Sequence, residues 1–409
     1  MPARTKARTR MAVTFALLAA GVVSVPIGVA PAAADGPGVG SPWVISLGDS
    51  AISGEAGRWA GNTNDSPSRV DALGADAYFD NATRTAEQIP GCHRSESAAI
   101  HIGGGVNSLN LACSGARTYT HGGGDSDFKP GIDFYNDGAG HKGQALMLQE
   151  FAGSHNVRMV AVLIGANDYG FADILQSCFL DWYFSPSWWP DYCYDDSDIA
   201  SRFTPSNIAA KTEAIRGALL NVRQAMANAG YADSAYTIMV HTYWSPIPKG
   251  AGNRYPESGY TRQTVGGCGM WNRDADWANN TVVPTFNNSV RNAVAQSGLT
   301  NTKILDLTSS LNGRRLCENT VGLLEEVGIA SWTSRKAVDR TEWVNQLRTS
   351  STIGGPYQIQ ESVHANYWGQ LAMRNCMRLA YNGGVPRGGV CVRSNTGLNS
   401  YGEPKMALQ

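Results

Sequence analysis

Residues 44–55 read VISLGDSAISGE and join an apolar, β-branched run to a Gly-Asp-Ser corner. A short apolar run that stops at a glycine is typical of a buried strand, so we expect a strand over 43–47. Ser50 follows three residues after the end of that strand. Either this is an ordinary strand-to-loop turn, or the corner presents the Ser50 hydroxyl to a ligand.

Similar runs recur along the chain and alternate with helical patterns. Three more apolar runs predict buried strands, at 157–164, 236–241 and 303–307. Apolar spacing of three and four predicts helices over 206–229, 287–296 and 367–381. Alternation of this kind predicts an α/β fold, a three-layer α/β/α sandwich with a central parallel sheet. The remaining segments are read as long loop insertions, at 62–140, 171–198, 246–276 and 318–356. No Pro-rich linker divides the chain, which favours one decorated domain over two.

Composition narrows the class of protein. Hydrophobic residues make up 43% of the 409 residues and charged residues 16%, which favours a sizeable core over disorder. The formal net charge is −1, and a nucleic-acid-binding protein usually carries a basic excess. We therefore expect no nucleic-acid partner.

The first 34 residues have the pattern of an export signal. Lys6, Arg8 and Arg10 precede an apolar stretch over 11–30, and 32–34 is Ala-Ala-Ala. A basic start, an apolar centre and small residues before a cleavage point are typical of a signal peptide. We expect 1–34 to be removed rather than to anchor the chain. The protein over 35–409 is then secreted and has no transmembrane anchor, because no later apolar stretch is long enough to span.

Eight cysteines lie in the part predicted to be exported. An even number in an exported chain indicates disulfides, and no Cys-x-x-Cys pattern points to zinc. Their spacing forms four local couples and favours sequential pairing, as Cys92–Cys113, Cys178–Cys193, Cys268–Cys317 and Cys376–Cys391.

Four short blocks place chemistry at predicted strand ends and loops. Ser50 follows the first strand, and GAND at 165–168 follows the second. ACSGA at 112–116 is a small-residue turn around Gly115. Near the C-terminus, Glu361 precedes His364 by three residues, just before a predicted helix. In open α/β sheets, ligands bind outside the carboxyl ends of the strands, so these blocks define a candidate site.

The four blocks, in this order, resemble those of the SGNH or GDSL-type hydrolases. The NYWGQ run after the histidine is similar to that of large secreted actinobacterial esterases and lipases. The resemblance implies Ser50 as the nucleophile, His364 as its base and Glu361 as the acid that orients the imidazole. It also implies an oxyanion hole made by the Ser50 and Gly115 backbone N–H groups and the Asn167 amide. No metal or organic cofactor is needed for this chemistry.

Three positions depart from the family pattern. Residue 51 is Ala instead of Leu, and residue 365 is Ala where close relatives have Pro. The acid is Glu361 instead of the usual Asp, and its extra methylene changes its reach. Some relatives orient the histidine with a backbone carbonyl, and both arrangements remain open for this chain.

The segment CFLDWYFSPSWWPDYC at 178–193 is crowded with aromatic residues. Its tryptophans, Trp182, Trp188 and Trp189, either form a lid or acyl-chain wall beside the site, or make a satellite core. The acidic run at 191–198 favours a solvated loop over a calcium site.

Together these features predict a secreted, monomeric serine esterase that acts through an acyl-enzyme. Lipid esters, including phospholipid acyl esters, are the first expected substrates, with possible contact at a lipid interface. A polysaccharide O-acetyl esterase is the alternative, and a secreted binding protein with an inactive hydrolase fold is a third reading.

Overall fold

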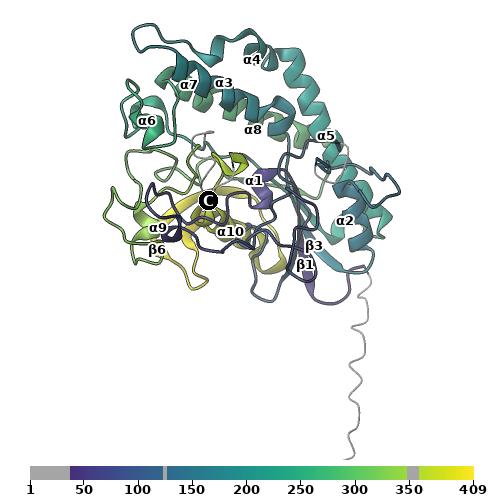
Figure 1. Ribbon diagram of the computed structural model, residues 1–409. Helices are drawn as coiled ribbons and strands as arrows, with labels where there is room; N and C mark the ends of the chain where they lie inside the picture. The colour runs from purple at the N-terminus through teal and green to yellow at the C-terminus, as the bar shows by residue number, and fades with distance from the viewer. Residues whose placement is uncertain (1–36, 123–126, 348–358) are drawn as a thin grey trace, which may run out of the picture. The chain divides into compact units, whose positions relative to one another are not determined.

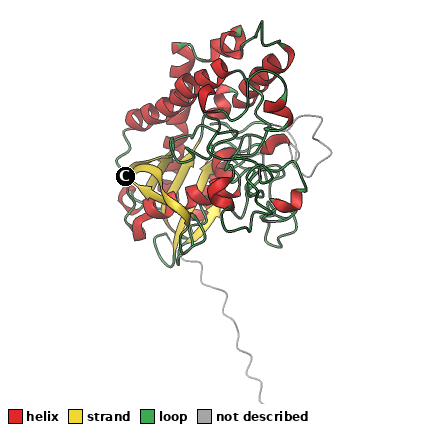
Figure 2. Ribbon diagram, turned by 90° about the vertical axis from the view of Figure 1, so that its left-hand side faces the viewer, coloured by secondary structure: helices red, strands yellow, loops and turns green. Residues whose placement is uncertain are grey.

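The computed structural model describes residues 37–122, 127–347 and 359–409. Within these residues the strands form one sheet of seven, in the order β2-β1-β3-β4-β5-β6-β7. Figure 2 shows the strands in yellow and the helices around them in red (see also Figure 1). The strands are β1 Pro42–Gly48, β2 Asn107–Asn110, β3 Asn156–Leu163, β4 Thr237–His241, β5 Thr302–Asp306, β6 Gly389–Leu398 and β7 Pro404–Leu408. All neighbours are parallel except β6 and β7, which pair antiparallel.

The chain changes direction across the sheet at β1. β1 pairs with β2 on one side and with β3 on the other, and the later strands then continue outward from β3. Such a reversal leaves a crevice at the carboxyl end of the strand where it occurs. Ser50 lies directly after β1, so the fold places it at this crevice.

Helices cover a sheet whose inner strands are buried on both faces. Most residues of β1, β3 and β4 are buried. α2 and α8 both pack against α5, and α10 packs against β5 and β7. The described helices are α1 Ser50–Ser53, α2 Gln144–Ala152, α3 Phe171–Phe184, α4 Ser197–Arg202, α5 Pro205–Asn228, α6 Thr261–Thr264, α7 Asn272–Trp277, α8 Val283–Ser297, α9 Ala337–Arg340 and α10 Tyr367–Tyr381 (Figure 1). The predicted α/β sandwich is confirmed, with an antiparallel strand added at one edge.

The predicted strands and helices match the structure closely where a continuous apolar pattern exists. β1, β3, β4 and β5 begin and end within one residue of the predicted bounds. β2 reads NSLN, and most of β6 is exposed or half-buried, so neither carries the apolar run that identifies a buried strand. The prediction of an irregular loop over 171–198 is wrong, because α3 and α4 occupy most of it.

All eight cysteines are paired, and the predicted sequential pairing is confirmed. The Cys92–Cys113 bridge closes the segment before the Gly115 turn, and Cys178–Cys193 joins α3 to the loop after it. Among the helices of the described residues, none is long and apolar enough to cross a membrane. The predicted signal segment, 1–34, lies outside the described residues.

Candidate active site

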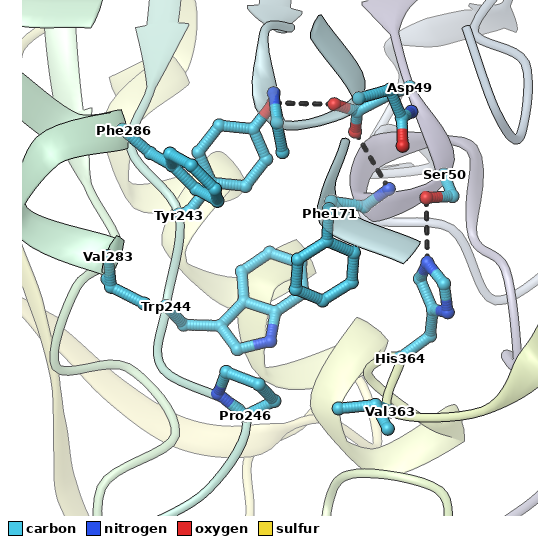
Figure 3. Close-up of a pocket in the computed structure, with 13 residues that line it drawn as sticks. Asp49, Ser50, Phe171, Tyr243, Trp244, Pro246, Val283, Phe286, Val363 and His364 are labelled. Carbon is cyan, nitrogen blue, oxygen red and sulfur yellow. Dashed lines mark hydrogen bonds between the residues drawn. The ribbon is translucent and has the colours of Figure 1, made fainter. Parts of the chain in front are cut away.

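The Gly-Asp-Ser corner is held by hydrogen bonds from both sides. The Asp49 carboxylate Oδ1 accepts from the Ala51 backbone N–H at 3.0 Å and caps α1, which starts at Ser50. Its Oδ2 accepts from the Tyr243 hydroxyl at 2.5 Å (Figure 3). Burial raises the pKa of Asp49 to about 7, although the bond from Tyr243 lowers it. Asp49 therefore braces the turn that carries Ser50.

Ser50 and His364 meet across 314 residues of sequence. The Ser50 Oγ lies 2.7 Å from His364 Nε2, as the dashed line in Figure 3 shows. The other ring nitrogen, Nδ1, lies 3.0 Å from the Ser362 backbone carbonyl oxygen. A carbonyl oxygen only accepts, so Nδ1 carries the proton and donates to Ser362. Nε2 is then the unprotonated nitrogen and accepts from the Ser50 hydroxyl.

The prediction that the Glu361 carboxylate orients His364 is wrong in this structure. Glu361 is buried, and its Oε2 accepts from the Trp59 indole N–H at 2.9 Å. Its Oε1 accepts from the Tyr78 hydroxyl. The backbone carbonyl of Ser362 takes the position expected for the acid. Trp59 and Tyr78 each supply a buried donor that needs an acceptor, and the carboxylate satisfies both.

The two remaining blocks lie at the same edge of the sheet. Gly115 has φ +81°, which glycine adopts without steric cost. Asn167 lies in the 3₁₀ turn Ala166–Tyr169 that directly follows β3. Its Nδ2 donates to the Ala116 carbonyl at 2.9 Å, which ties the two blocks together and leaves a second N–H on the same nitrogen. The oxyanion-hole roles of Ser50, Gly115 and Asn167 remain predictions.

An aromatic pocket opens beside Ser50 and His364. Its apolar lining comes from α3, the segment after β4, α8 and the segment before His364 (Figure 3). The side chains with large apolar surfaces are Phe171, Tyr243, Trp244, Val283, Phe286 and Val363. The sequence did not predict that these residues line one pocket, because they are widely separated along the chain.

None of the three predicted substrate-contacting tryptophans lines this pocket. Trp182 is buried, packs edge-on against Trp271, and donates its indole N–H to the Glu257 carbonyl at 3.0 Å. Trp188 and Trp189 are 81% and 74% exposed. Trp182 is therefore an interior residue and the other two are surface residues, and the roles expected for the three tryptophans stay predictions.

Burial of its imidazole ring favours the neutral form of His364 near pH 7. Burial lowers the pKa of His364 below its ordinary 6.5, and the negative charge of Glu55 opposes this by raising it. Glu55 is itself fully buried and paired with His93, whose Nδ1 lies 2.8 Å from Glu55 Oε1. A neutral imidazole is the form able to accept a proton from serine.

We predict an acid limb in the pH profile of ester hydrolysis. Protonated His364 cannot act as a base, so kcat/KM falls as pH drops through the pKa of His364. Because that pKa lies below 6.5, the midpoint of the fall is expected below pH 6.5. Initial rates measured from pH 4.5 to 9, with recovery of activity after return to pH 8, separate this titration from acid unfolding. A midpoint above 6.5 would contradict the burial argument.

Replacing Glu361 by Gln is expected to reduce stability more than catalysis. The amide loses one acceptor oxygen, so either Trp59 Nε1–H or Tyr78 O–H can no longer donate to residue 361, at a cost of about 1–3 kcal/mol. The Ser362 carbonyl stays in place, so kcat is expected to change less than about tenfold, against about 10⁴ for loss of a true triad acid. Urea unfolding and kcat together decide whether Glu361 has a structural role or acts as the triad acid. Tyr78→Phe, which removes one of the two donors, is the matched control.

The fold and the site together define a class. An α/β sandwich with a serine–histidine pair at its topological switch point resembles the SGNH or GDSL-type hydrolases, the class to which the four sequence blocks pointed.

Comparisons with known proteins found distant likenesses among solved structures. No protein-family model and no curated protein sequence matches the chain. An extracellular lipase from Streptomyces rimosus is 18% identical, with a TM-score of 0.43, over 81% of this chain and 95% of the lipase. A phospholipase A1 from Streptomyces albidoflavus is 18% identical, with a TM-score of 0.42, over 85% of this chain and 100% of that enzyme.

A third solved structure is a family two carbohydrate esterase from Clostridium thermocellum. It is 11% identical, with a TM-score of 0.33, over 84% of this chain and 63% of that chain. Likenesses this distant carry no argument about substrate or mechanism. The function of this chain has to be argued from the geometry of its own site.

Proposed function

We propose that this protein is a serine hydrolase that cleaves carboxylic esters through an acyl-enzyme. The observation that carries the proposal is the 2.7 Å contact between Ser50 Oγ and His364 Nε2 at the mouth of the aromatic pocket. A serine hydroxyl is a weak nucleophile, and an adjacent base within hydrogen-bond distance is what activates it. The Ser362 carbonyl supports this arrangement by holding the proton on His364 Nδ1.

The steps follow from these positions. Ser50 Oγ attacks the carbonyl carbon of the ester while its proton passes to His364 Nε2. The resulting oxyanion would accept from the Ser50 and Gly115 backbone N–H groups and from the second N–H of Asn167. His364 then returns the proton to the leaving alcohol oxygen, and the acyl group stays on Ser50. Water, activated by the same imidazole, attacks the acyl-enzyme and releases the carboxylic acid.

The lining of the pocket favours lipid esters. Phe171, Trp244 and Phe286 offer apolar surface next to the nucleophile, where an acyl chain is able to leave water. Four disulfides and the expected export segment over 1–34 support a secreted enzyme. The pocket has a volume of about 50 Å³, which an acetyl group is also able to enter, so polysaccharide O-deacetylation stays as the alternative.

Hydrolysis of p-nitrophenyl esters from acetate to palmitate tests the proposal. Each methylene that enters the pocket is worth up to about 0.8 kcal/mol, so kcat/KM is expected to rise by up to about fourfold per CH₂ over the first additions. In the Trp244→Ala variant the rise is expected to be shallower, with acetate least affected. Activity confined to acetate would favour a deacetylase. Failure of a fluorophosphonate to label Ser50, with no hydrolysis at any length, would favour a binding protein.

A further inference from the structure

A second pocket shares one lining residue with the candidate site and differs from the aromatic pocket in chemistry. Asn167 lines both pockets. The lining of the second pocket is mostly polar, and its residues include Arg117, Tyr119, Asp168, Asp173, Arg202 and Lys211. One part of the pocket comes from residues that follow two of the proposed oxyanion donors, Gly115 and Asn167, and the other part comes from α3, α4 and α5. Its place beside the ester-binding position is therefore set in part by the same turns.

The two carboxylates of this pocket already have partners. Asp168 accepts from the Thr118 backbone N–H at 3.0 Å and from the Thr118 hydroxyl at 2.7 Å. Asp173 is paired with Arg202, whose Nη1 lies 2.9 Å from Asp173 Oδ2. Arg202 Nη1 also contacts the backbone carbonyls of Tyr169 and Gly170. These contacts hold the walls of the pocket together.

Two cations of the pocket form no close ion pair with the described residues, although both charges act on Asp168 and oppose the rise that burial causes in its pKa. Among the residues that the structure describes, neither Arg117 nor Lys211 lies within 4.0 Å of a carboxylate oxygen as an ion pair. The Arg117 guanidinium donates to the Tyr119 hydroxyl at 3.0 Å, and the Tyr119 ring is half exposed. Both cations are only partly exposed. The pocket holds three cations, Arg117, Arg202 and Lys211, against two carboxylates, so it has a local positive excess in a chain with a formal net charge of −1.

We propose that Arg117 and Lys211 form a subsite for a phosphate group carried by the polar half of the ester substrate. The inference rests on the proposed function and names its substrate class: a lipid ester whose acyl chain occupies the aromatic pocket and whose phosphate-bearing alcohol half occupies the basic one. A neutral glycan would be held by hydroxyl and amide groups without needing two cations. The oxygens of a phosphate accept charge-assisted hydrogen bonds from both cations, and an arginine is able to bind a phosphate through two N–H groups.

A matched pair of soluble esters tests this subsite. 1-Butyrylglycerol and 1-butyrylglycerol 3-phosphate share the scissile bond and differ only in the phosphate. For the unmodified protein at pH 8, we expect kcat/KM to be higher for the phosphate ester, and the ratio to decrease when salt screens the charges. In Arg117→Gln and in Lys211→Gln, the ratio of the two kcat/KM values is expected to fall about tenfold, as for loss of one charge-assisted hydrogen bond.

Lys303→Gln is the control, because Lys303 is an exposed lysine of β5 that lines neither pocket. It is expected to leave the ratio unchanged. The proposal is overturned if the ratio stays constant in the Arg117 and Lys211 variants, or falls equally in the control.

A second measurement keeps the subsite testable without variants. Glycerol 3-phosphate is expected to compete with 1-butyrylglycerol at concentrations at least about tenfold lower than glycerol, because only the phosphate pairs with the two cations. Equal competition by the two compounds would overturn the subsite while leaving ester hydrolysis intact. Hydrolysis of neither ester, together with calorimetric binding of glycerol 3-phosphate, would instead overturn the proposed function and leave the subsite standing.

Discussion

Replacing Ser50 by alanine is expected to lower kcat for ester hydrolysis by about 10⁴-fold or more while the protein still folds. Without the hydroxyl there is no atom to form the acyl-enzyme, and His364 Nε2 loses the proton donor that lies 2.7 Å from it. The donors proposed for the oxyanion hole stay in place, so a small rate above that of water is expected to remain. The measurement is kcat with p-nitrophenyl butyrate for the two proteins, with thermal unfolding followed in parallel.

The fold is expected to survive because the backbone of Ser50, not its side chain, holds the corner. The Ser50 carbonyl accepts from the Ser53 hydroxyl at 3.2 Å and from the Glu55 N–H at 3.3 Å, and alanine keeps both bonds. Alanine is also at least as compatible with α1 as serine.

Ser53→Ala is the matched control within the same short helix. The Ser53 hydroxyl is buried and contacts the carbonyls of Ser50 and His93, so its loss costs about 1 kcal/mol of stability but leaves the nucleophile in place. The control is expected to keep most of its activity. Esterase activity in Ser50→Ala equal to that of the unmodified protein would contradict the proposed mechanism.

The parts of the fold that the sequence predicted share one physical property. β1, β3 and β4 are buried on both faces, so each needs a continuous apolar run, and such runs are visible in the sequence. The ends of those strands then located Ser50 and Asn167, because parallel strands end at one edge of the sheet. β6 and β7 pair at the other edge of the sheet, where many residues are half-buried or exposed. These strands do not need a continuous apolar run, so the sequence does not reveal them.

The parts of the site that the sequence misplaced depend on contacts across long separations. Glu361 is close to His364 in sequence, but its carboxylate bonds to Trp59 and Tyr78, about 300 residues earlier. A spacing of three residues predicts that two side chains are near each other; it does not predict which buried donors compete for the carboxylate. The pocket wall at Trp244 was missed for a related reason, since nothing local marks it as facing Ser50.

Replacing Gly48 by alanine is expected to have the largest effect on stability of any single substitution at the corner. Gly48 has φ +140°, and an added Cβ would lie 1.9 Å from the Leu163 carbonyl oxygen and 2.8 Å from its carbon. Gly48 and Leu163 are paired in the β1–β3 ladder, so backbone and not a flexible side chain blocks the space. The substitution combines an unfavourable φ with a backbone clash, and a loss of more than about 4 kcal/mol is expected.

The surrounding hydrogen bonds prevent the corner from moving aside. The Gly48 N–H donates to Gln144 Oε1 at 2.7 Å, and its carbonyl accepts from Gln144 Nε2 at 2.9 Å and from the Cys113 N–H at 3.0 Å. The Asp49 N–H donates to the Leu163 carbonyl at 3.0 Å. Moving Gly48 away from Leu163 would break several of these bonds at once, and the Cys113 bond links the corner to the Gly115 turn.

Gly217→Ala separates this clash from a general intolerance of added methyl groups. Gly217 lies within α5, and an added Cβ there meets nothing within 4 Å, so alanine is expected to raise the free energy of unfolding by about 0.5–1 kcal/mol. Soluble yield and urea unfolding compare the two variants. A Gly48→Ala protein within about 1 kcal/mol of the unmodified one, on the scale of ordinary surface substitutions, would mean that β1 and β3 are able to separate at the corner. In that case Ser50, two residues further on, would not be held against His364 as tightly as the proposed chemistry requires.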